Sequence, residues 1–262
     1  MFSRLEMYGE WLRADPLGLI VYMLYFTLTV LLSLILHECA HGYVALRCGD
    51  PTAKMLGRLT LDPRKHLDPI GTVTMFLLGF GWAKPVPVNP RNFRSYRRDD
   101  FLVSIAGIVT NLSLFLICTV LSVIVNNLMA GPVLYQQFAS SPEDKRLLYD
   151  ILSSYLYTGN LYEGLAALCA MPWLQYIQRF LLMMQSVNLS LALFNLLPIP
   201  PLDGYHLLND TLLKGRLQLD RRVFEMTRVV LLVLCLSGAL NGLLSTMHEA
   251  VENAVLNLLM LI

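Results

Sequence analysis

The feature that most constrains this chain is a run of twenty uncharged, mostly apolar residues, 17–36. A helix needs about 20 such residues to cross the hydrocarbon core of a bilayer, so the run predicts a membrane-spanning helix. The sequence His37-Glu38-Cys39-Ala40-His41 follows it directly. Ionisable side chains are rare within a membrane segment and are usually functional. Their position therefore indicates a functional site within the membrane or at its edge.

The spacing of the two histidines suits a shared metal ion. Residues i and i+4 lie on one face of a helix, so His37 and His41 can direct both imidazoles at one cation. Glu38 is rotated by about 100° from His37, so it is better placed to reach a water on that cation than to bind the cation. Zinc lowers the pKa of its bound water to about 7, and a nearby carboxylate can take the remaining proton. The HExxH pattern is typical of zinc proteases, although these residues could also simply end a helix near lipid headgroups.

Composition agrees with a membrane protein and argues against other classes. Of the 262 residues, 55% are hydrophobic and only 15% are charged, whereas a soluble domain carries about 25% charged residues. The formal net charge of +1 gives no indication of nucleic-acid binding. The five cysteines are scattered, which predicts neither a disulfide framework nor a CxxC zinc site. The first apolar run is too long for a cleavable signal peptide, so we expect it to be retained.

Four apolar segments predict membrane spans, at residues 17–46, from 101 past 126, 180–197 and 229–246. Residues 69–83 are uncharged but too short to cross, and their glycines suggest a re-entrant or hairpin element. Residues 54–61 partly alternate and could add a strand to the same small sheet. We therefore predict a single all-α polytopic membrane domain over residues 1–262, with about four to six transmembrane helices and a small membrane-associated β element.

Basic residues predict the orientation of these spans. Three clusters, in residues 47–65, 84–98 and 214–222, fall on one side of the membrane if the four spans alternate. That side is predicted to be cytoplasmic with both termini outside, although Arg4 and Arg13 oppose this weakly. Residues 127–179 then form an extracytoplasmic loop, which holds either interfacial helices or partly ordered chain.

Asp203 is the candidate for a third metal ligand, because a catalytic zinc keeps three protein ligands and one open position. It lies in Asn195-Leu-Leu-Pro-Ile-Pro-Pro-Leu-Asp203-Gly204, after the third span and at the same predicted membrane side as the histidines. The prolines would break the helix, and Gly204 allows a sharp turn. Two alternatives stay open. Asp203 could instead cap the following helix, and His206 could be a competing ligand.

Two asparagines and one proline-rich stretch could support such a site. Asn111, within the second span, could support a ligand, the substrate backbone or a developing oxyanion, or it could join two helices. Asn195 could steady the site or bind the unwound backbone of residues 198–201. The sequence GWAKPVPVNP at residues 81–90 suggests an extended stretch, which could offer a strand-like edge to a substrate or form a rigid surface loop.

Four motifs, in order, resemble the site-2 protease family of intramembrane zinc metalloproteases: HExxH at 37–41, GWAKPVPVNP at 81–90, GxxxN at 107–111 and NLLPIPPLDG at 195–204. The resemblance implies a core of three membrane helices, one zinc ion held by His37, His41 and Asp203, and Glu38 as general base. It also implies a membrane-anchored protein substrate that is cut within or near its transmembrane segment. The chain departs from the family in lacking the proline that commonly follows the GxxxN glycine, and no PDZ or CBS domain is visible.

Two rival functions predict other patterns. A polytopic metal transporter or sensor would favour ligands on several spans, yet the fourth predicted span has no ionisable residue between Arg228 and His248. A catalytically inactive scaffold would not need Glu38 beside His37. The sequence therefore favours peptide-bond hydrolysis, most readily in a prokaryotic plasma membrane with the site toward the cytoplasm. It leaves the substrate and the oligomeric state open.

Overall fold

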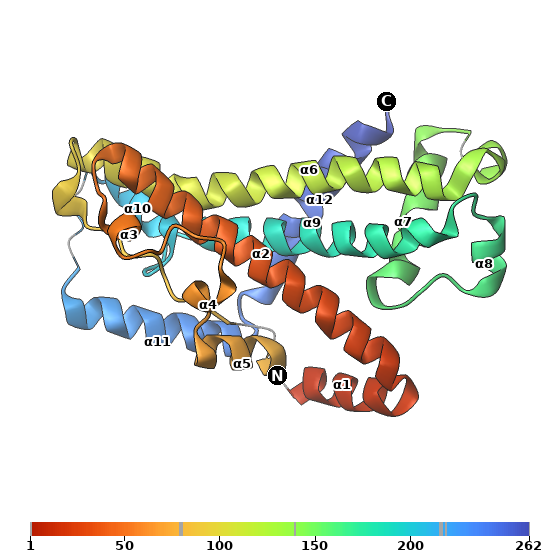
Figure 1. The fold of residues 1–262 in the computed structure, drawn as a ribbon, viewed down its shortest axis with the longest axis horizontal. Helices are drawn as coiled ribbons and strands as arrows, with labels where there is room; N and C mark the ends of the chain where they lie inside the picture. The colour runs from red at the N-terminus through yellow and green to blue at the C-terminus, as the bar shows by residue number, and fades with distance from the viewer. Residues whose placement is uncertain (1, 79–80, 139, 215–216, 218, 262) are drawn as a thin grey trace. The chain divides into compact units, whose positions relative to one another are not determined.

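The computed structural model describes residues 2–78, 81–138, 140–214, 217 and 219–261, and these are mostly helical (Figure 1). Three helical segments are long and apolar enough to cross a membrane: α2 (Pro16–Cys48), α6 (Tyr96–Phe138) and Pro172–Asn195, which contains η2 (Pro172–Leu174) and α9 (Gln175–Asn195). A fourth candidate is the pair α11 (Arg221–Ser237) and α12 (Asn241–Met260), which bend by 75° at their junction. The sequence predicted four to six transmembrane helices. The structure agrees only with the lower limit of four, and only if α11 and α12 together form one span.

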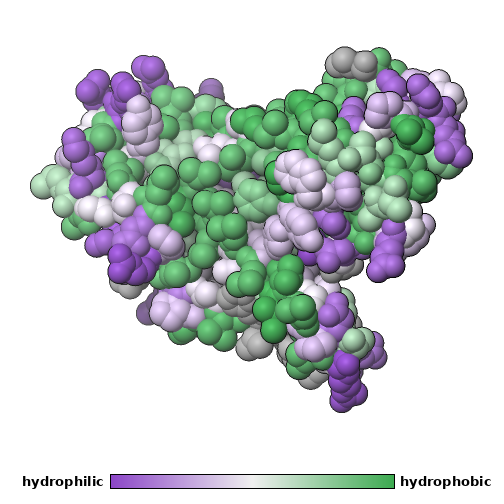
Figure 2. Space-filling model, turned by 45° about the vertical axis from the view of Figure 1, so that its right-hand side comes forward, coloured by the Kyte–Doolittle hydropathy of each residue, from purple (hydrophilic) through white to green (hydrophobic). Residues whose placement is uncertain are grey.

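Helix α2 contains the first predicted span and has defined ends. The Asp15 carboxylate accepts a hydrogen bond from the Gly18 N–H at 2.9 Å, and Pro16 takes the first helical position. Gly49, with φ of 111°, follows the last helical residue. In the most apolar 18-residue stretch of α2, only 22% is buried. The helix therefore leaves a large apolar surface uncovered, as a lipid-facing helix does. Figure 2 shows broad hydrophobic areas on one face of the molecule.

Two of the predicted spans differ from the helices that form. Helix α6 runs beyond the second predicted span, through a break at Gly131, where φ is 72°, before Pro132. Residues 229–246 are not one helix, because Gly238 adopts a left-handed φ of 76° and ends α11. The predicted fourth span at residues 229–246 therefore corresponds to a bent helix pair and not to one straight helix. Hydropathy reports which residues tolerate lipid, and it does not report the direction of the backbone.

The predicted β element is also wrong for the residues that the structure describes. Residues 54–61 contain the end of the short helix α3 (Thr52–Met55) and a turn, and α5 (Pro69–Leu78) is helical; residues 79–80 lie outside the described residues. One antiparallel bridge joins Leu67 to Ala83. In α5 the Thr72 hydroxyl donates to the Asp68 carbonyl at 2.7 Å, so a β-branched residue is accommodated in a helical turn.

The chain divides into two compact units, each built from three stretches of sequence. The first unit comprises Met1–Gly9, Leu31–Leu112 and Ser190–Ser245, and it contains all four motifs. The second comprises Glu10–Val30, Ser113–Leu189 and Thr246–Ile262. Helices α1 (Phe2–Ala14), α2, α6 and α9 each contribute residues to both units.

The first unit also contains the short elements α3, α4 (Pro63–His66), α5, η1 (Pro90–Asn92) and α10 (Asp203–Thr211). A buried carboxylate joins two of them, α3 and η1. Asp50 is fully buried and accepts hydrogen bonds from the Asn89 N–H and the Asn92 side-chain amide, both at 2.7 Å, and from the Thr52 N–H at 3.1 Å. A buried carboxylate is tolerated when hydrogen bonds satisfy its oxygens. Asp50 thereby fixes the end of the 81–90 stretch to the chain that follows α2.

The second unit contains α7 (Pro142–Thr158) and α8 (Glu163–Leu168), so the predicted loop at residues 127–179 does hold helices; their place at a membrane interface stays a prediction. A polar network joins four helices here. The Ser122 hydroxyl lies 2.8 Å from the Tyr149 hydroxyl and 3.1 Å from the Gln185 Oε1, and the Gln185 amide donates to Glu252 at 3.1 Å. These contacts fix α6, α7, α9 and α12 to one another within the unit.

Candidate metal centre

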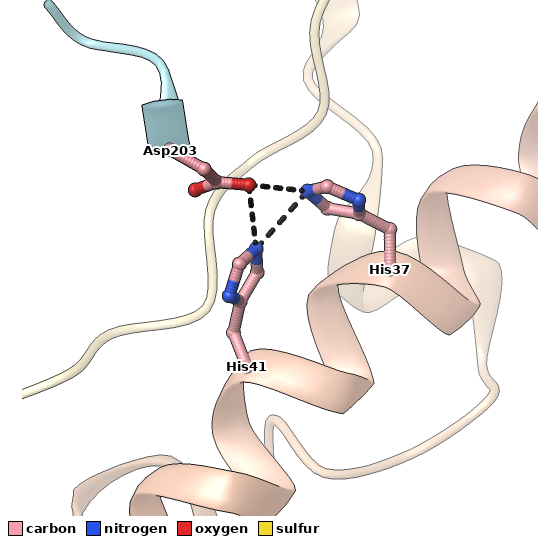
Figure 3. Close-up of side chains that lie close together, drawn as sticks. All are labelled: His37, His41 and Asp203. Atoms are coloured by element: carbon pink, nitrogen blue, oxygen red, sulfur yellow. Dashed lines mark hydrogen bonds and ion pairs between the residues drawn. The ribbon is translucent and has the colours of Figure 1, made fainter. Parts of the chain in front are cut away.

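The two histidines of α2 and the first residue of α10 meet at one point (Figure 3). The His37 and His41 Nε2 atoms lie 3.0 Å apart, and the Asp203 Oδ2 lies 3.4 Å from the first and 3.3 Å from the second. In the described part of the chain, no other three residues of the types His, Cys, Asp and Glu lie close enough together to share a metal ion. Segments 162 residues apart in sequence therefore converge at one point.

The start of α10 determines where the Asp203 carboxylate points. The N-cap position is Leu202, and no side chain caps the helix there, so the structure does not show the alternative in which Asp203 is the cap. A Cβ on Gly204 would overlap the carbonyl oxygens of Leu196 and Leu197. Glycine is therefore needed here for a close backbone approach between α10 and the end of α9.

The outer nitrogen of each imidazole contacts α6. The His41 Nδ1 lies 2.7 Å from the Val103 carbonyl, which only accepts hydrogen bonds, so Nδ1 carries a proton and Nε2 is the nitrogen that faces Asp203. The His37 Nδ1 lies 3.1 Å from the amide nitrogen of Asn111, which is fully buried. The Asn111 oxygen has no hydrogen-bond partner among the described residues. Rotating this amide by 180° would let its oxygen accept from a protonated His37 Nδ1.

Gly107 lies against both imidazoles. A Cβ built at this position would overlap the His37 ring and the His41 Nε2. Val103, Gly107 and Asn111 are spaced at i, i+4 and i+8, so they share one face of α6. The GxxxN motif at 107–111 did not indicate that the partners of Gly107 are the two histidines.

Glu38 is held by the stretch at residues 81–90. Its Oε2 accepts a hydrogen bond from the Val86 N–H at 2.7 Å. Val86 stands between Pro85 and Pro87, neither of which has an N–H, so it supplies the one backbone donor of this triplet. The sequence analysis missed Val86 and Val103 because both act through backbone atoms, which leave no side-chain signal.

Two residues singled out in the sequence lie differently. The Asn195 amide donates to the Leu191 carbonyl, one turn back in α9, at 3.0 Å, and none of its described contacts reaches His37, His41 or Asp203. The His206 Nδ1 lies 3.3 Å from the Asp100 Oδ2 on α6, so this imidazole is paired with a carboxylate and does not join the group of three.

His206 belongs to a second charged cluster. The contact with Asp100 raises the pKa of His206 above its ordinary value. Burial, together with the charge of Asp100, raises the pKa of Asp210 to about 6. The Arg97 guanidinium donates to the Asp210 backbone carbonyl at 3.4 Å. The first turn of α6 and the far end of α10 are thus joined by polar contacts.

The group of three fits a zinc ion. A tetrahedral zinc with bonds of about 2.0–2.1 Å places its ligand atoms about 3.3–3.4 Å apart, close to the 3.0, 3.3 and 3.4 Å between the three donor atoms. The Asp203 Oδ2 is buried and no described donor satisfies it as a hydrogen-bond acceptor. Two imidazole nitrogens and a carboxylate oxygen attract one another only when a cation or a proton lies among them, so the arrangement suits a cation.

Comparison with known proteins agrees with this geometry. The chain belongs to peptidase family M50, whose family model matches residues 25–238. It is 36% identical to "Putative zinc metalloprotease YwhC" of Bacillus subtilis, over 93% of both chains. It is 30% identical to "Putative zinc metalloprotease Rip2" of Mycobacterium tuberculosis, over 88% of this chain and 75% of that protein. No solved structure matches the chain. The resemblance to the site-2 protease family is confirmed, and the family and its relatives' names support a zinc metalloprotease.

The Gly107 contact predicts that Gly107→Ala weakens metal binding. The added methyl group would displace one or both imidazoles, so we expect the affinity for zinc to fall by about 10–100-fold, as it does when groups that orient metal ligands are changed. Gly9→Ala is the control, because a Cβ there meets no atom within 4 Å. Titration of both purified variants with zinc against a chromophoric chelator measures the effect, and equal affinities would contradict it.

The raised pKa of Asp210 predicts a pH-dependent gain in stability for Asp210→Asn. The folded protein keeps this proton up to about pH 6, whereas the unfolded chain releases it near the ordinary value of 3.8. The carboxylate therefore destabilises the fold increasingly as the pH rises from about 4 through 6, and a neutral amide does not. We expect the Tm of Asp210→Asn, measured relative to that of the unchanged protein, to increase between pH 4 and pH 8.

Asp62→Asn is the matched control. Hydrogen bonds from Arg64 lower the pKa of Asp62, so its ionised form is favoured in the folded protein. Asp62→Asn should therefore lower the Tm by an amount that changes little between pH 4 and pH 8, because the carboxyl group is ionised in both the folded and the unfolded protein over most of that range. Thermal unfolding in detergent at pH 4, 6 and 8 measures both variants. The same pH dependence of the Tm in Asp210→Asn and Asp62→Asn would refute the assignment for Asp210.

Proposed function

We propose that this protein is an intramembrane zinc metalloprotease that hydrolyses a peptide bond within or near the transmembrane segment of a membrane-anchored protein. The observation that carries the proposal is the convergence of His37, His41 and Asp203 within 3.4 Å of one another, with Glu38 beside the first ligand, on a helix long enough to cross a bilayer. Soluble zinc proteases do not need such a helix.

Each of the three side chains has one atom available for a single zinc ion per chain. His37 and His41 would bind it through Nε2 and Asp203 through Oδ2, and the fourth position would stay open for a water or a substrate. Zinc bound there would supply an acidified water and would polarise the scissile carbonyl. The contact between His41 Nδ1 and the Val103 carbonyl favours the tautomer of the neutral ring in which Nδ1 carries the proton, so Nε2 is the nitrogen that would bind the ion.

Glu38 is the proposed general base. Its carboxylate would take a proton from the attacking water and deliver it to the leaving amine nitrogen as the carbon–nitrogen bond breaks. The hydrogen bond from the Val86 N–H to Oε2 holds this carboxylate in place. Asn111 contacts His37, which favours a role in orienting that ligand over a direct role at the oxyanion.

The stretch at residues 81–90 has few backbone N–H and carbonyl groups free to pair with a substrate, because several of them already form hydrogen bonds within the protein. The N–H groups of Lys84, Val86 and Asn89 already donate to His66, Glu38 and Asp50, and Arg58 donates to the carbonyls of Lys84 and Pro85. A helical substrate must unwind to release its own N–H and carbonyl groups. It would then pair with the remaining groups of residues 86–88.

The proposed location is the plasma membrane of a bacterium, with the metal site toward the cytoplasm. The relatives named above are bacterial proteins. The basic residues that follow α2 and precede α6 indicate the cytoplasmic side. The partners are then the lipid bilayer and a single-span protein substrate. A metal transporter would need further ligand groups along a pathway, and the described residues offer one such group.

Glu38→Gln should abolish cleavage and leave zinc bound. The amide cannot accept the proton of the attacking water, so we expect the rate to fall by at least about 10²–10⁴-fold, the usual contribution of a general base. The assay combines the purified protein in proteoliposomes with a panel of single-span proteins, with and without a chelator. Full activity of this variant would remove the role assigned to Glu38.

Asp203→Ala should lower the zinc content of the protein. With two histidines left, we expect the affinity for zinc to fall by more than the roughly 10–100-fold that follows changes outside the ligands themselves. Asp150→Ala is the control, because Asp150 is paired with Arg146 in the second unit, 2.9 Å away. Metal analysis of both variants measures the difference, and an unchanged zinc content in Asp203→Ala would reassign the third ligand.

A further inference from the structure

We propose that His206 and Asp100 form a clamp between α10 and α6 that positions Asp203 for metal binding. The inference rests on the proposed function, because it concerns the third ligand of the same site. In this role the two residues are positioning residues: neither belongs to the group of three donors, and both act through the placement of α10.

The clamp joins one turn of α10 to one turn of α6. Asp203 is the first residue of α10, and His206 follows at i+3, about one turn on. The His206 Nδ1 lies 3.3 Å from the Asp100 Oδ2. A second contact, from the Arg97 guanidinium to the Asp210 carbonyl at 3.4 Å, joins the same two helices further along α10.

Helix α6 carries the contacts to the other two ligands as well. Val103, one turn after Asp100, accepts from His41, and Gly107 and Asn111 follow against the imidazoles. One helix therefore sets the positions of both histidine rings directly and the position of the aspartate through the clamp. A shift of α10 along α6 would move Asp203 relative to both rings.

Apart from the contact between α10 and α6, few described contacts fix the position of the Asp203 carboxylate. No side chain caps α10 at Leu202, and among the described contacts the Oδ2 faces only the two imidazoles. A helix of nine residues is not stable by itself, so its packing decides its placement. Tyr205 adds a hydrogen bond to the Leu217 carbonyl at 2.8 Å, but that contact is to the chain that follows α10 and not to α6.

The chemistry of His206 allows a matched pair of substitutions. An asparagine places its amide nitrogen close to the position of the imidazole Nδ1, so His206→Asn can keep a hydrogen bond to Asp100. His206→Leu fills similar space without a donor. A residue that only fills space would tolerate leucine as well as asparagine, whereas the clamp requires the donor. Asp100→Asn keeps the shape of the side chain and removes its charge, so it tests the contribution of the carboxylate to the pair.

The experiment measures the zinc affinity of the full-length protein in detergent, together with the visible absorption spectrum of the cobalt-substituted protein, which reports the geometry of the ligands. We expect His206→Leu to lose about 10–100-fold in zinc affinity and to change the cobalt spectrum, while His206→Asn stays near the unchanged protein. Asp100→Asn should weaken binding, and its combination with His206→Leu should cost little more than either change alone. His248→Leu is the control, because it removes the donor of a histidine–carboxylate pair with Glu252 in the second unit.

Three results would overturn the clamp: equal zinc affinity in His206→Leu and His206→Asn, fully additive losses in the double variant, or an unchanged cobalt spectrum in His206→Leu. Thermal unfolding identifies any variant that does not fold, and Asp100→Asn, which keeps the shape of the side chain, then decides. Failure of the proposed function shows itself separately, as a zinc-loaded protein that cleaves no membrane-anchored substrate. If the clamp proposal is wrong, substitutions at His206 and Asp100 leave the zinc affinity unchanged.

Discussion

Two imidazoles at the end of an apolar helix destabilise the fold unless each polar atom finds a partner, and the first unit is arranged around this constraint. The outer nitrogens contact Val103 and Asn111 on α6, and the inner nitrogens face Asp203 on α10. Gly107 provides the space in which the two rings lie. Because each of these contacts comes from a helix other than α2, the metal site can form only when the three helices have packed together.

The sequence could indicate His37, His41 and Asp203 as one candidate group because its signals are local and strong. An i, i+4 pair at the end of a membrane-length apolar run, and an acidic residue after a second run, can be placed on one side of a membrane by counting charges. The contacts that orient the group were not predictable in this way. Val103 and Val86 contribute backbone atoms, and Asp100 and His206 are 106 residues apart with no pattern that relates them.

The wrong predictions share a physical cause. Partial alternation in 54–61 and the glycines of 69–83 suggested a small β element. Short helices form there instead, stabilised by hydrogen bonds such as that from the Thr72 hydroxyl to the Asp68 carbonyl. The predicted fourth span is uncharged throughout, yet Gly238 bends the backbone within it. In each case apolar character was correctly recognised, while the backbone conformation depended on single glycines and on side-chain hydrogen bonds that hydropathy does not reflect.

The hydrogen bond from Val86 to Glu38 has a consequence for sequence change. Its donor is a peptide N–H, which nineteen of the twenty amino acids possess, so nearly any residue at position 86 retains it. A side-chain donor would be lost through many single substitutions. The orientation of the acidic group is thus robust to mutation at the very residue that provides it, and only a third proline between Pro85 and Pro87 would delete the donor outright.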